Sequence, residues 1–530
     1  MRLADHIRDG RKGVDARRVL TIVWFGALVF VLLTGLLLLL QRLGLTLNLT
    51  MIILGSATLL MLLVLAWLGR TMSSAHFFYA NRMAGSTALG VGGLTDWISG
   101  SFLVLLLVLP LAGKMVLAPA LMLGFVLQTG LFAMTFQRSG VATVSGFMDW
   151  RTRSRSTGLA TLAVTLGILG LLIVADGLVL LRLVEQVTGL SGPAVTIATL
   201  ALAGLPALMG GWLSLVLVNG VLAVWMVLSL LAPAIATGFM RNWLASQAAI
   251  APNTQTIDPL QLAHSALPLV GANWGVGSIS GLSVGLTLFV LACGFATLPT
   301  ALSRAALARQ PIAAMETNSW TSLAAFLVLS AVPLSLALIA PQPEAAQLAQ
   351  LLRTDGVLYA LPHLALTLAA LNALSVCLHT FAVALARALR RTRRLDPGEQ
   401  SMFPARLVTL GLLVGLYFIA PLPLPARLST PGDMLLAALA LGAGGLFLPL
   451  LFFIWGPVMH RFAGGFAALA GGAAVATGFW FGRMPVLEAG LMGMGISGGI
   501  MLLAAFPALL SGKPREDLRH AQLRDPTPIS

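Results

Sequence analysis

Two carboxyl groups fall inside long apolar stretches, where ionised side chains are rarely found. Asp96 follows a glycine-rich segment, and Asp176 follows sixteen uncharged residues with no further charge before Arg182. A charge in hydrocarbon costs at least about 2.5 kcal/mol, so such side chains usually line a cavity or pair with another group. We predict that Asp96 is an ion-coupling or gating carboxylate. Asp176 is predicted to carry a proton or to bind a cation.

Each carboxyl group also has a structural alternative. Asp96 could cap a helix near the membrane interface by accepting hydrogen bonds from the amides of Ser99 or Gly100. Asp176 could form an ion pair with Arg182, six residues further on, or lie in an outer vestibule.

Other polar side chains lie near the same stretches, and most have a structural interpretation. Hydroxyl groups in membrane helices often bond to their own backbone or to a neighbouring helix. The amide of Asn372 needs partners at both ends, whereas His379, close to the basic run at Arg387–Arg394, is interpreted as structural. The predicted ion and solute path comprises Asp96, Trp97, Ser99, Ser101, Asp176, Thr297, Pro299, Thr367, Asn372 and Ser375.

The composition requires lipid as the solvent for most of the chain. Of its 530 residues, 58% are hydrophobic and only 9% are charged, against about 25% charged in soluble domains. The net charge of +14 is attributed to cytoplasmic loops rather than to nucleic-acid binding. Cys293 and Cys377 lie in apolar runs and are interpreted as small buried hydrophobes. No cofactor is expected, and the only metal site considered is one for Na+.

Fourteen membrane spans are predicted, because each span needs about 20 apolar residues. The uncharged stretch from residue 186 to 240 is long enough for two, which we divide at Gly210-Gly211. The others are 19–40, 51–69, 89–111, 115–136, 159–186, 279–302, 320–340, 358–385, 407–424, 434–455, 466–481 and 487–510.

The distribution of basic residues sets the expected orientation. With these spans, 25 of the 32 lysines and arginines fall on one side and seven on the other. Because basic loops stay on the cytoplasmic side, both termini are predicted to be cytoplasmic in a multi-pass protein of the inner (plasma) membrane. The largest outer loop is expected at about residues 238–278.

Helices three to seven and eight to twelve form two candidate units of five. Five spans per unit would invert the second copy, an arrangement common in transporters with broken helices at the midplane. Candidate breakers in the first unit are Gly90, Gly92 and Gly93, followed after Asp96 by Gly100; those in the second are Gly294 and Thr297-Leu298-Pro299. The predicted regions are a basic N-terminus at 1–18, two peripheral helices and a loop at 19–88, the first repeat at 89–240, an outer loop at 241–278, the second repeat at 279–457, two C-terminal helices at 458–512 and a tail at 513–530.

Several motifs, in order along residues 50 to 400, resemble the sodium:solute symporter family, most closely its cation/acetate branch. The most specific are HFFYANR at 76–82 and GLTDWISGSF at 93–102. Weaker matches are Ala175-Asp176 with Arg182 and Glu185, Gly210-Gly211-Trp212, Leu298-Pro299 with Arg304, and Ser375 with His379. The resemblance implies an all-α polytopic LeuT-type fold with a 5+5 inverted-repeat core. It places solute and ion between the third and eighth helices, with the fifth and tenth lining the path.

The chain departs from that family pattern at positions that bear on the coupling ion. Asn81, Asp176, Thr300 and Thr380 replace the glycine, glutamine, histidine and aspartate of the branch. The family holds sodium partly through hydroxyls of the eighth core helix, but Thr367 is the only hydroxyl between residues 364 and 372 here. We therefore predict weak sodium dependence and a contribution from a pH gradient.

The predicted function is secondary active transport: a sodium- or proton-coupled symporter of a small organic solute such as a monocarboxylate. The expected partners are that solute, a coupling cation and the lipid bilayer, without nucleic acid. The alternative is a transport-inactive paralogue that acts as a membrane sensor or partner subunit. An enzyme is not expected, because the sequence has no phosphate-binding loop or nucleophile elbow. The oligomeric state is left open.

Overall fold

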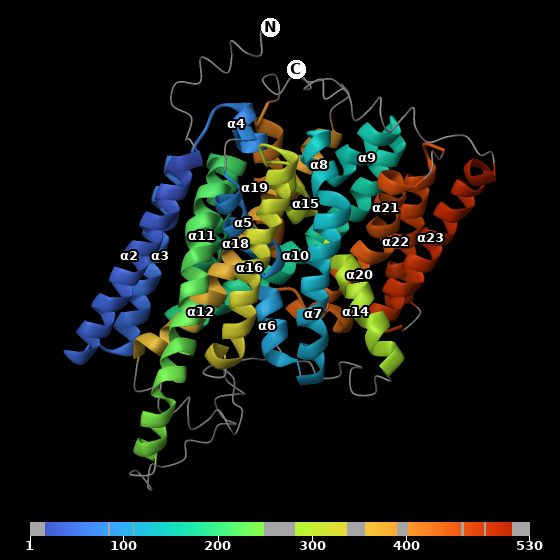
Figure 1. The fold of residues 1–530 in the computed structure, drawn as a ribbon. Coiled ribbons are helices and arrows are strands. Elements are labelled where there is room, and N and C mark those ends of the chain that lie inside the picture. The colour runs from blue at the N-terminus through green and yellow to red at the C-terminus, as the bar shows by residue number, and fades with distance from the viewer. Residues whose placement is uncertain are drawn as a thin grey trace.

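The computed structural model describes residues 16–82, 85–109, 111–248, 281–336, 356–389, 401–456, 460–481 and 484–510. Within these ranges every regular element is a helix, and long helices run side by side between two faces of the molecule (Figure 1). Nine of the described helices are long and apolar enough to cross a membrane, or up to eleven if each of two bent pairs forms one span. The chain is therefore a multi-pass membrane protein.

Eleven α-helices lie among the described residues of the first half of the chain. They are α2 (Ala16–Arg42), α3 (Leu47–Leu68), α4 (Ser74–Tyr79), α5 (Ser86–Trp97), α6 (Gly100–Val108), α7 (Leu111–Leu127), α8 (Met134–Ser139), α9 (Val144–Thr152), α10 (Arg155–Thr188), α11 (Pro193–Met209) and α12 (Trp212–Ala248). The second half contains α14 (Gly281–Ala296), α15 (Pro299–Ala305), α16 (Pro311–Leu336), α18 (Gly356–Ala388), α19 (Phe403–Ile419), α20 (Pro431–Leu441), α21 (Leu448–Trp455), α22 (Ala463–Trp480) and α23 (Val486–Leu510).

Burial separates central helices from peripheral ones. In its most apolar window α18 is 89% buried, whereas α2 is only 28% buried. The exposed face of α2 carries large apolar side chains such as Trp24 and Leu32, which lipid would cover. α18 packs against α10, α12 and α11 and is therefore a central element of the bundle.

Each predicted span overlaps one described helix or two helices that follow each other in sequence, although α11 and α19 are short apolar helices of 17 residues each. The count of fourteen crossings therefore stays a prediction. The division at Gly210-Gly211 is confirmed, because α11 ends at Met209 and α12 begins at Trp212. Gly211 has φ of +56°, and a Cβ there would lie 2.4 Å from the carbonyl oxygen of Phe77. Only glycine fits this turn without strain.

Two helices are broken, one in each predicted unit. α5 and α6 form a pair bent by 53°, and α14 and α15 form a pair bent by 49°. The second break, at Thr297-Leu298, lies where the sequence predicted it, because Pro299 begins α15 and has no amide hydrogen to continue the helix. Both breaks lie in the middle of the bundle.

The first break falls at Ile98-Ser99, directly before the predicted Gly100, which begins α6. The other predicted glycines, Gly90, Gly92 and Gly93, all lie within α5 and do not break it. These glycines allow close packing instead: a Cβ on Gly90 would lie 2.5 Å from the carbonyl oxygen of Thr317, and one on Gly92 would lie 3.1 Å from the amide nitrogen of Gly220. They therefore bring α16 and α12 against α5.

Some helix bounds also differ from the sequence prediction. α16 begins at Pro311 rather than near Trp320, because the polar segment before Trp320 continues the helix from a favourable N-terminal proline. α12 continues to Ala248, into the stretch predicted as outer loop 241–278. The segment 241–248 contains arginine, leucine, glutamine and alanine, which are good helix formers. The remainder of that predicted loop lies outside the described residues.

The predicted orientation can be tested at the two ends of α3. Leu43, before this helix, is 79% exposed, and Met72, after it, is 85% exposed. The native Cys293 and Cys377 are buried. In intact cells we expect an impermeant thiol reagent to label Leu43→Cys and to label Met72→Cys only after the membrane is permeabilised. Labelling of Met72→Cys alone in intact cells would invert the orientation.

Candidate functional site

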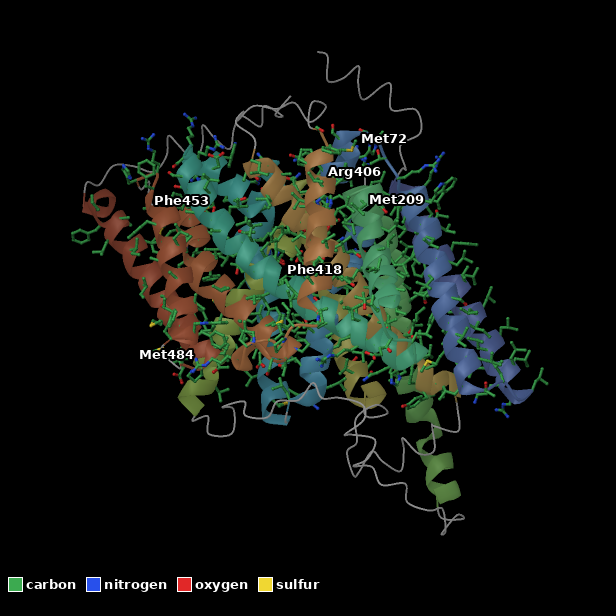
Figure 2. The ribbon with its side chains drawn as sticks, turned by 180° about the vertical axis from the view of Figure 1, so that it is seen from behind. Met72, Met209, Arg406, Phe418, Phe453 and Met484 are labelled. Carbon is green, nitrogen blue, oxygen red and sulfur yellow. The ribbon has the colours of Figure 1, made fainter. Side chains whose placement is uncertain are left out.

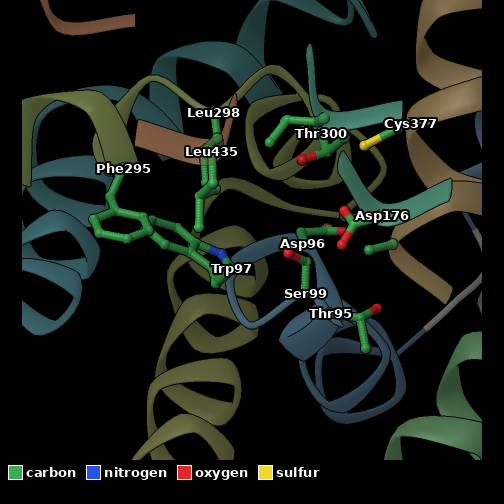
Figure 3. Close-up of a pocket in the computed structure, with 12 residues that line it drawn as sticks. Thr95, Asp96, Trp97, Ser99, Asp176, Phe295, Leu298, Thr300, Cys377 and Leu435 are labelled. Atoms are coloured by element: carbon green, nitrogen blue, oxygen red, sulfur yellow. The ribbon is translucent and has the colours of Figure 1, made fainter. Parts of the chain in front are cut away.

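A small closed cavity lies where the two broken helices meet α10, α18 and α20. It leaves about 10 Å³ for the centre of a water molecule, which is space for about one water-sized occupant. Figure 3 shows its polar side chains gathered on one side and Trp97, Phe295 and Leu435 on the other. The lining residues are Thr95, Asp96, Trp97, Ser99, Leu172, Asp176, Phe295, Leu298, Thr300, Ala373, Cys377 and Leu435.

Asp96 forms a buried ion pair with Arg304 that joins the two broken helices. Arg304 Nε lies 2.5 Å from Oδ2 and Nη2 lies 3.1 Å from Oδ1, so the carboxylate is held at two points. Arg304 is 2% exposed, and its guanidinium lies 5.4 Å from the ring centre of Trp212. The capping alternative for Asp96 is wrong, because Ser99 is the residue that caps α6, through its hydroxyl and the amide of Phe102.

Asp176 contacts the start of α6 instead of Arg182. Its Oδ1 accepts a hydrogen bond of 2.8 Å from the backbone amide of Ser101. Asp176 is 1% exposed, and its Oδ2 has no hydrogen-bond partner among the described residues. The ion-pair alternative with Arg182 is not what the structure contains, since α10 turns Asp176 towards the broken helix.

Some hydroxyl groups around the cavity form hydrogen bonds within the described chain, and others do not. Ser99 Oγ and Ser101 Oγ lie 2.8 Å apart and share a hydrogen bond. The hydroxyls of Thr95 and Thr300 are buried and have no partner within the described part of the chain. Two hydroxyl groups without a hydrogen-bond partner in the described chain therefore belong to residues that line the same cavity as Asp176.

The remaining predicted path residues lie away from the cavity lining. Thr297 donates to the carbonyls of Cys293 and Gly294, and Thr367 donates to that of His363. Pro299 forms the first turn of α15. These hydroxyls bond to their own helices, as hydroxyls in apolar surroundings often do.

Two further candidates lie on α18. Ser375 donates to the carbonyls of Ala203, at 2.6 Å, and Leu371, so it fastens α18 to α11. Asn372 is fully buried, and its amide has no partner among the described residues. Neither residue lines the cavity, although their neighbour Ala373 does. A direct role for Thr297, Thr367, Asn372 or Ser375 stays a prediction.

His379 packs between two aromatic rings. The centres of the Phe77 and Trp212 rings lie 5.2 and 5.4 Å from its own, both edge-on. This packing agrees with the structural interpretation of the histidine, because Phe77, within α4, and Trp212, the first residue of α12, offer it aromatic surfaces.

Sequence reasoning missed Arg304 as the partner of Asp96. It also missed eight residues that line the cavity: Thr95, Leu172, Phe295, Leu298, Thr300, Ala373, Cys377 and Leu435. One signal could have identified Arg304. It lies just past the second break, as Asp96 lies just before the first, and opposite charges at equivalent places in low dielectric favour pairing.

The charges around the cavity do not balance. The ion pair between Arg304 and Asp96 neutralises Asp96. Asp176 has no cationic partner in the described part of the chain. The described residues contain no group of three or more histidine, cysteine, aspartate or glutamate side chains that could hold a metal ion.

Comparison with solved structures shows a shared fold. The chain matches a Na+-coupled sialic acid symporter, in a substrate-bound outward-open state, with a TM-score of 0.62 and 12% identity over 88% of this chain and 98% of the symporter. A manganese transporter of Eremococcus coleocola matches with a TM-score of 0.48 and 15% identity, over 86% and 98% of the two chains. Mhp1, a nucleobase-cation-symport-1 family transporter, matches with a TM-score of 0.46 and 14% identity, over 85% and 99%.

No protein-family model and no curated protein sequence matches the chain. At 12% identity the likeness to the sialic acid symporter concerns the fold alone. The chain has the all-helical fold of a Na+-coupled symporter, with two broken helices facing a buried carboxyl group.

Proposed function

We propose that the chain is a secondary active transporter with a LeuT-type 5+5 core, and that its solute and coupling ion pass through the cavity between the broken helices. The observation that carries this proposal is the position of Asp176, buried and without a cationic partner, at the first break. Broken helices at the midplane supply the ion and solute sites of such transporters. The fold shared with a Na+-coupled symporter supports the same function.

The small size of the cavity supports a closed state of the proposed transporter. Space for about one water molecule is too small for an organic solute. Entry of a solute therefore requires the broken helices to move relative to α10 and α18, as alternating access demands. Both termini would be cytoplasmic, in the inner (plasma) membrane, and the family would be that of the sodium:solute symporters, near the cation/acetate branch.

The alternative of a transport-inactive sensor or partner subunit has one supporting observation. On α18, Thr367 and Ser375 donate their hydroxyl hydrogens to carbonyl oxygens and do not line the cavity. A hydroxyl that donates its hydrogen keeps its lone pairs, so it is their position outside the lining that removes these two residues as sodium ligands in this cavity. Loss of these ligands fits either an inactive protein or a transporter that uses another cation site.

We expect sodium dependence to be weak and a pH gradient to contribute to uptake. Asp176 provides a titratable group at the cavity, whereas hydroxyl ligands from α18 are missing. The test is the initial rate of uptake by purified protein in liposomes. The candidate solutes include monocarboxylates, and the rate is measured against sodium at fixed pH and then against pH without sodium. A steep, saturable sodium requirement that Asp176→Gln leaves unchanged would refute this coupling scheme.

A further inference from the structure

The start of α6 already holds an anion supplied by the protein itself. The N-terminus of a half-helix carries a partial positive charge, and transporters use it to bind anionic groups of their solutes. In this chain the Ser101 amide donates to Asp176 Oδ1 at 2.8 Å, and the Phe102 amide donates to Ser99 Oγ at 3.3 Å. A solute carboxylate would have to displace Asp176 to reach the Ser101 amide.

The second oxygen of Asp176 points to a further ligand. Oδ2 is buried without a hydrogen-bond partner in the described chain, as are the hydroxyls of Thr95 and Thr300. All three residues line the same cavity (Figure 3). Three oxygen atoms with free lone pairs, one of them anionic, form a donor set for a hard cation or for an ammonium group.

Charge and size restrict the occupant further. The Arg304 guanidinium neutralises Asp96, whereas no cation among the described residues neutralises Asp176. The free space accepts about one water-sized group. Trp97 and Phe295, on the opposite side of the cavity, offer aromatic rings that favour cations over anions.

We propose that Asp176 is a built-in counter-anion of α6, and that the cavity binds a small monovalent cation through Asp176, Thr95 and Thr300 while excluding carboxylates. This inference rests on the proposed function for its role in transport. It argues against a monocarboxylate as the solute group bound at the first break. The cation is either free Na+ or the primary ammonium group of a solute, which share this chemistry.

The test is binding to the full-length protein in detergent, followed by its thermal unfolding midpoint at constant ionic strength. We expect a saturable rise in the midpoint with sodium chloride or methylammonium chloride, and none with choline chloride or choline acetate. A response to Na+ alone assigns the coupling ion, and a response to methylammonium assigns a solute ammonium group. No response to either cation would overturn the proposal.

Substitution of the proposed cation ligands tests their individual contributions to binding. Asp176→Asn and Thr300→Val are expected to weaken cation binding, the first by at least tenfold. Thr165→Val, on the same helix as Asp176, is the matched control, because its hydroxyl bonds only to the carbonyl of Thr161. Asp176→Ala exposes the Ser101 amide and should gain saturable stabilisation by choline acetate.

Other results of these titrations would contradict the inference. Saturable stabilisation of the unmodified protein by choline acetate, or unchanged cation binding by Asp176→Asn, would refute the inference. If a variant does not fold, the cation and acetate titrations of the unmodified protein still decide. Binding requires no transport, so a protein that binds cations but moves no solute would refute the proposed function and leave this inference standing.

Discussion

Asp96→Asn is expected to abolish coupled uptake and to lower the free energy of unfolding by about 3–5 kcal/mol, the range found when one member of a buried ion pair is removed. The physical reason is Arg304, which is 2% exposed and would keep its charge without a partner. The measurements are uptake into liposomes and thermal unfolding of the purified variant. Uptake and stability equal to those of the unmodified protein would contradict the prediction.

A double variant separates stability from transport. Asp96→Asn combined with Arg304→Gln removes both charges, so much of the lost stability should return, because the large cost of breaking a buried pair comes from the uncompensated charge left behind. Uptake should remain absent if the pair holds the broken helices in their transport geometry. Recovery of uptake together with stability would reduce the ion pair to a purely structural contact.

Gly100→Ala is expected to lower uptake by at least tenfold and stability by about 1–3 kcal/mol, the usual cost of overpacking. A Cβ on Gly100 would lie 2.5 Å from Cβ and 2.8 Å from Cα of Ala370, so α18 must move away from the start of α6. That movement would disturb the hydrogen bond between Ser101 and Asp176. The measurements are the unfolding midpoint and the initial uptake rate.

Gly170→Ala is the matched control for Gly100→Ala. Gly170 lies within α10, the helix that carries Asp176, and a Cβ there has no other atom within 4 Å. Alanine in a helix interior is favoured over glycine by up to about 1 kcal/mol. The two variants should therefore shift stability in opposite directions, and equal losses in both would show that the contact with Ala370 is unimportant.

The positions of the helices could be predicted from sequence because lipid imposes a simple rule. Apolar stretches of sufficient length must be helical in a bilayer, and charges in this chain are rare enough to separate them. Glycines were the less reliable signal. Gly90 and Gly92 were predicted as breakers, but they allow α16 and α12 to approach closely, which depends on the tertiary structure.

The candidate site was predictable in its parts but not in its pairings. Asp96 and Asp176 stood out because buried carboxyl groups are costly, and both line the cavity. Their partners could not be derived, because Arg304 lies 208 residues from Asp96 and Ser101 lies 75 residues from Asp176. Nor could local sequence show that the Ser375 hydroxyl donates a hydrogen bond to the carbonyl oxygen of Ala203 on another helix.

Arg406 joins three helices at one end of the bundle. Arg406 lies at one end of the bundle, near Met72 and Met209, and Met484 lies at the opposite end (Figure 2). Arg406 donates to the carbonyl oxygens of Thr71 and Met209 and so ties α19 to the ends of α3 and α11.

The central claim is that ion gradients drive a solute through the cavity beside Asp176. The most direct test is accumulation of labelled solute by liposomes that contain the purified protein, with sodium and pH gradients imposed separately. We expect the solute to accumulate above its outside concentration. This accumulation should collapse when an ionophore dissipates the driving gradient and should be lost in Asp176→Asn. Uptake that only equilibrates the solute under every gradient, or accumulation that Asp176→Asn leaves unchanged, would contradict it.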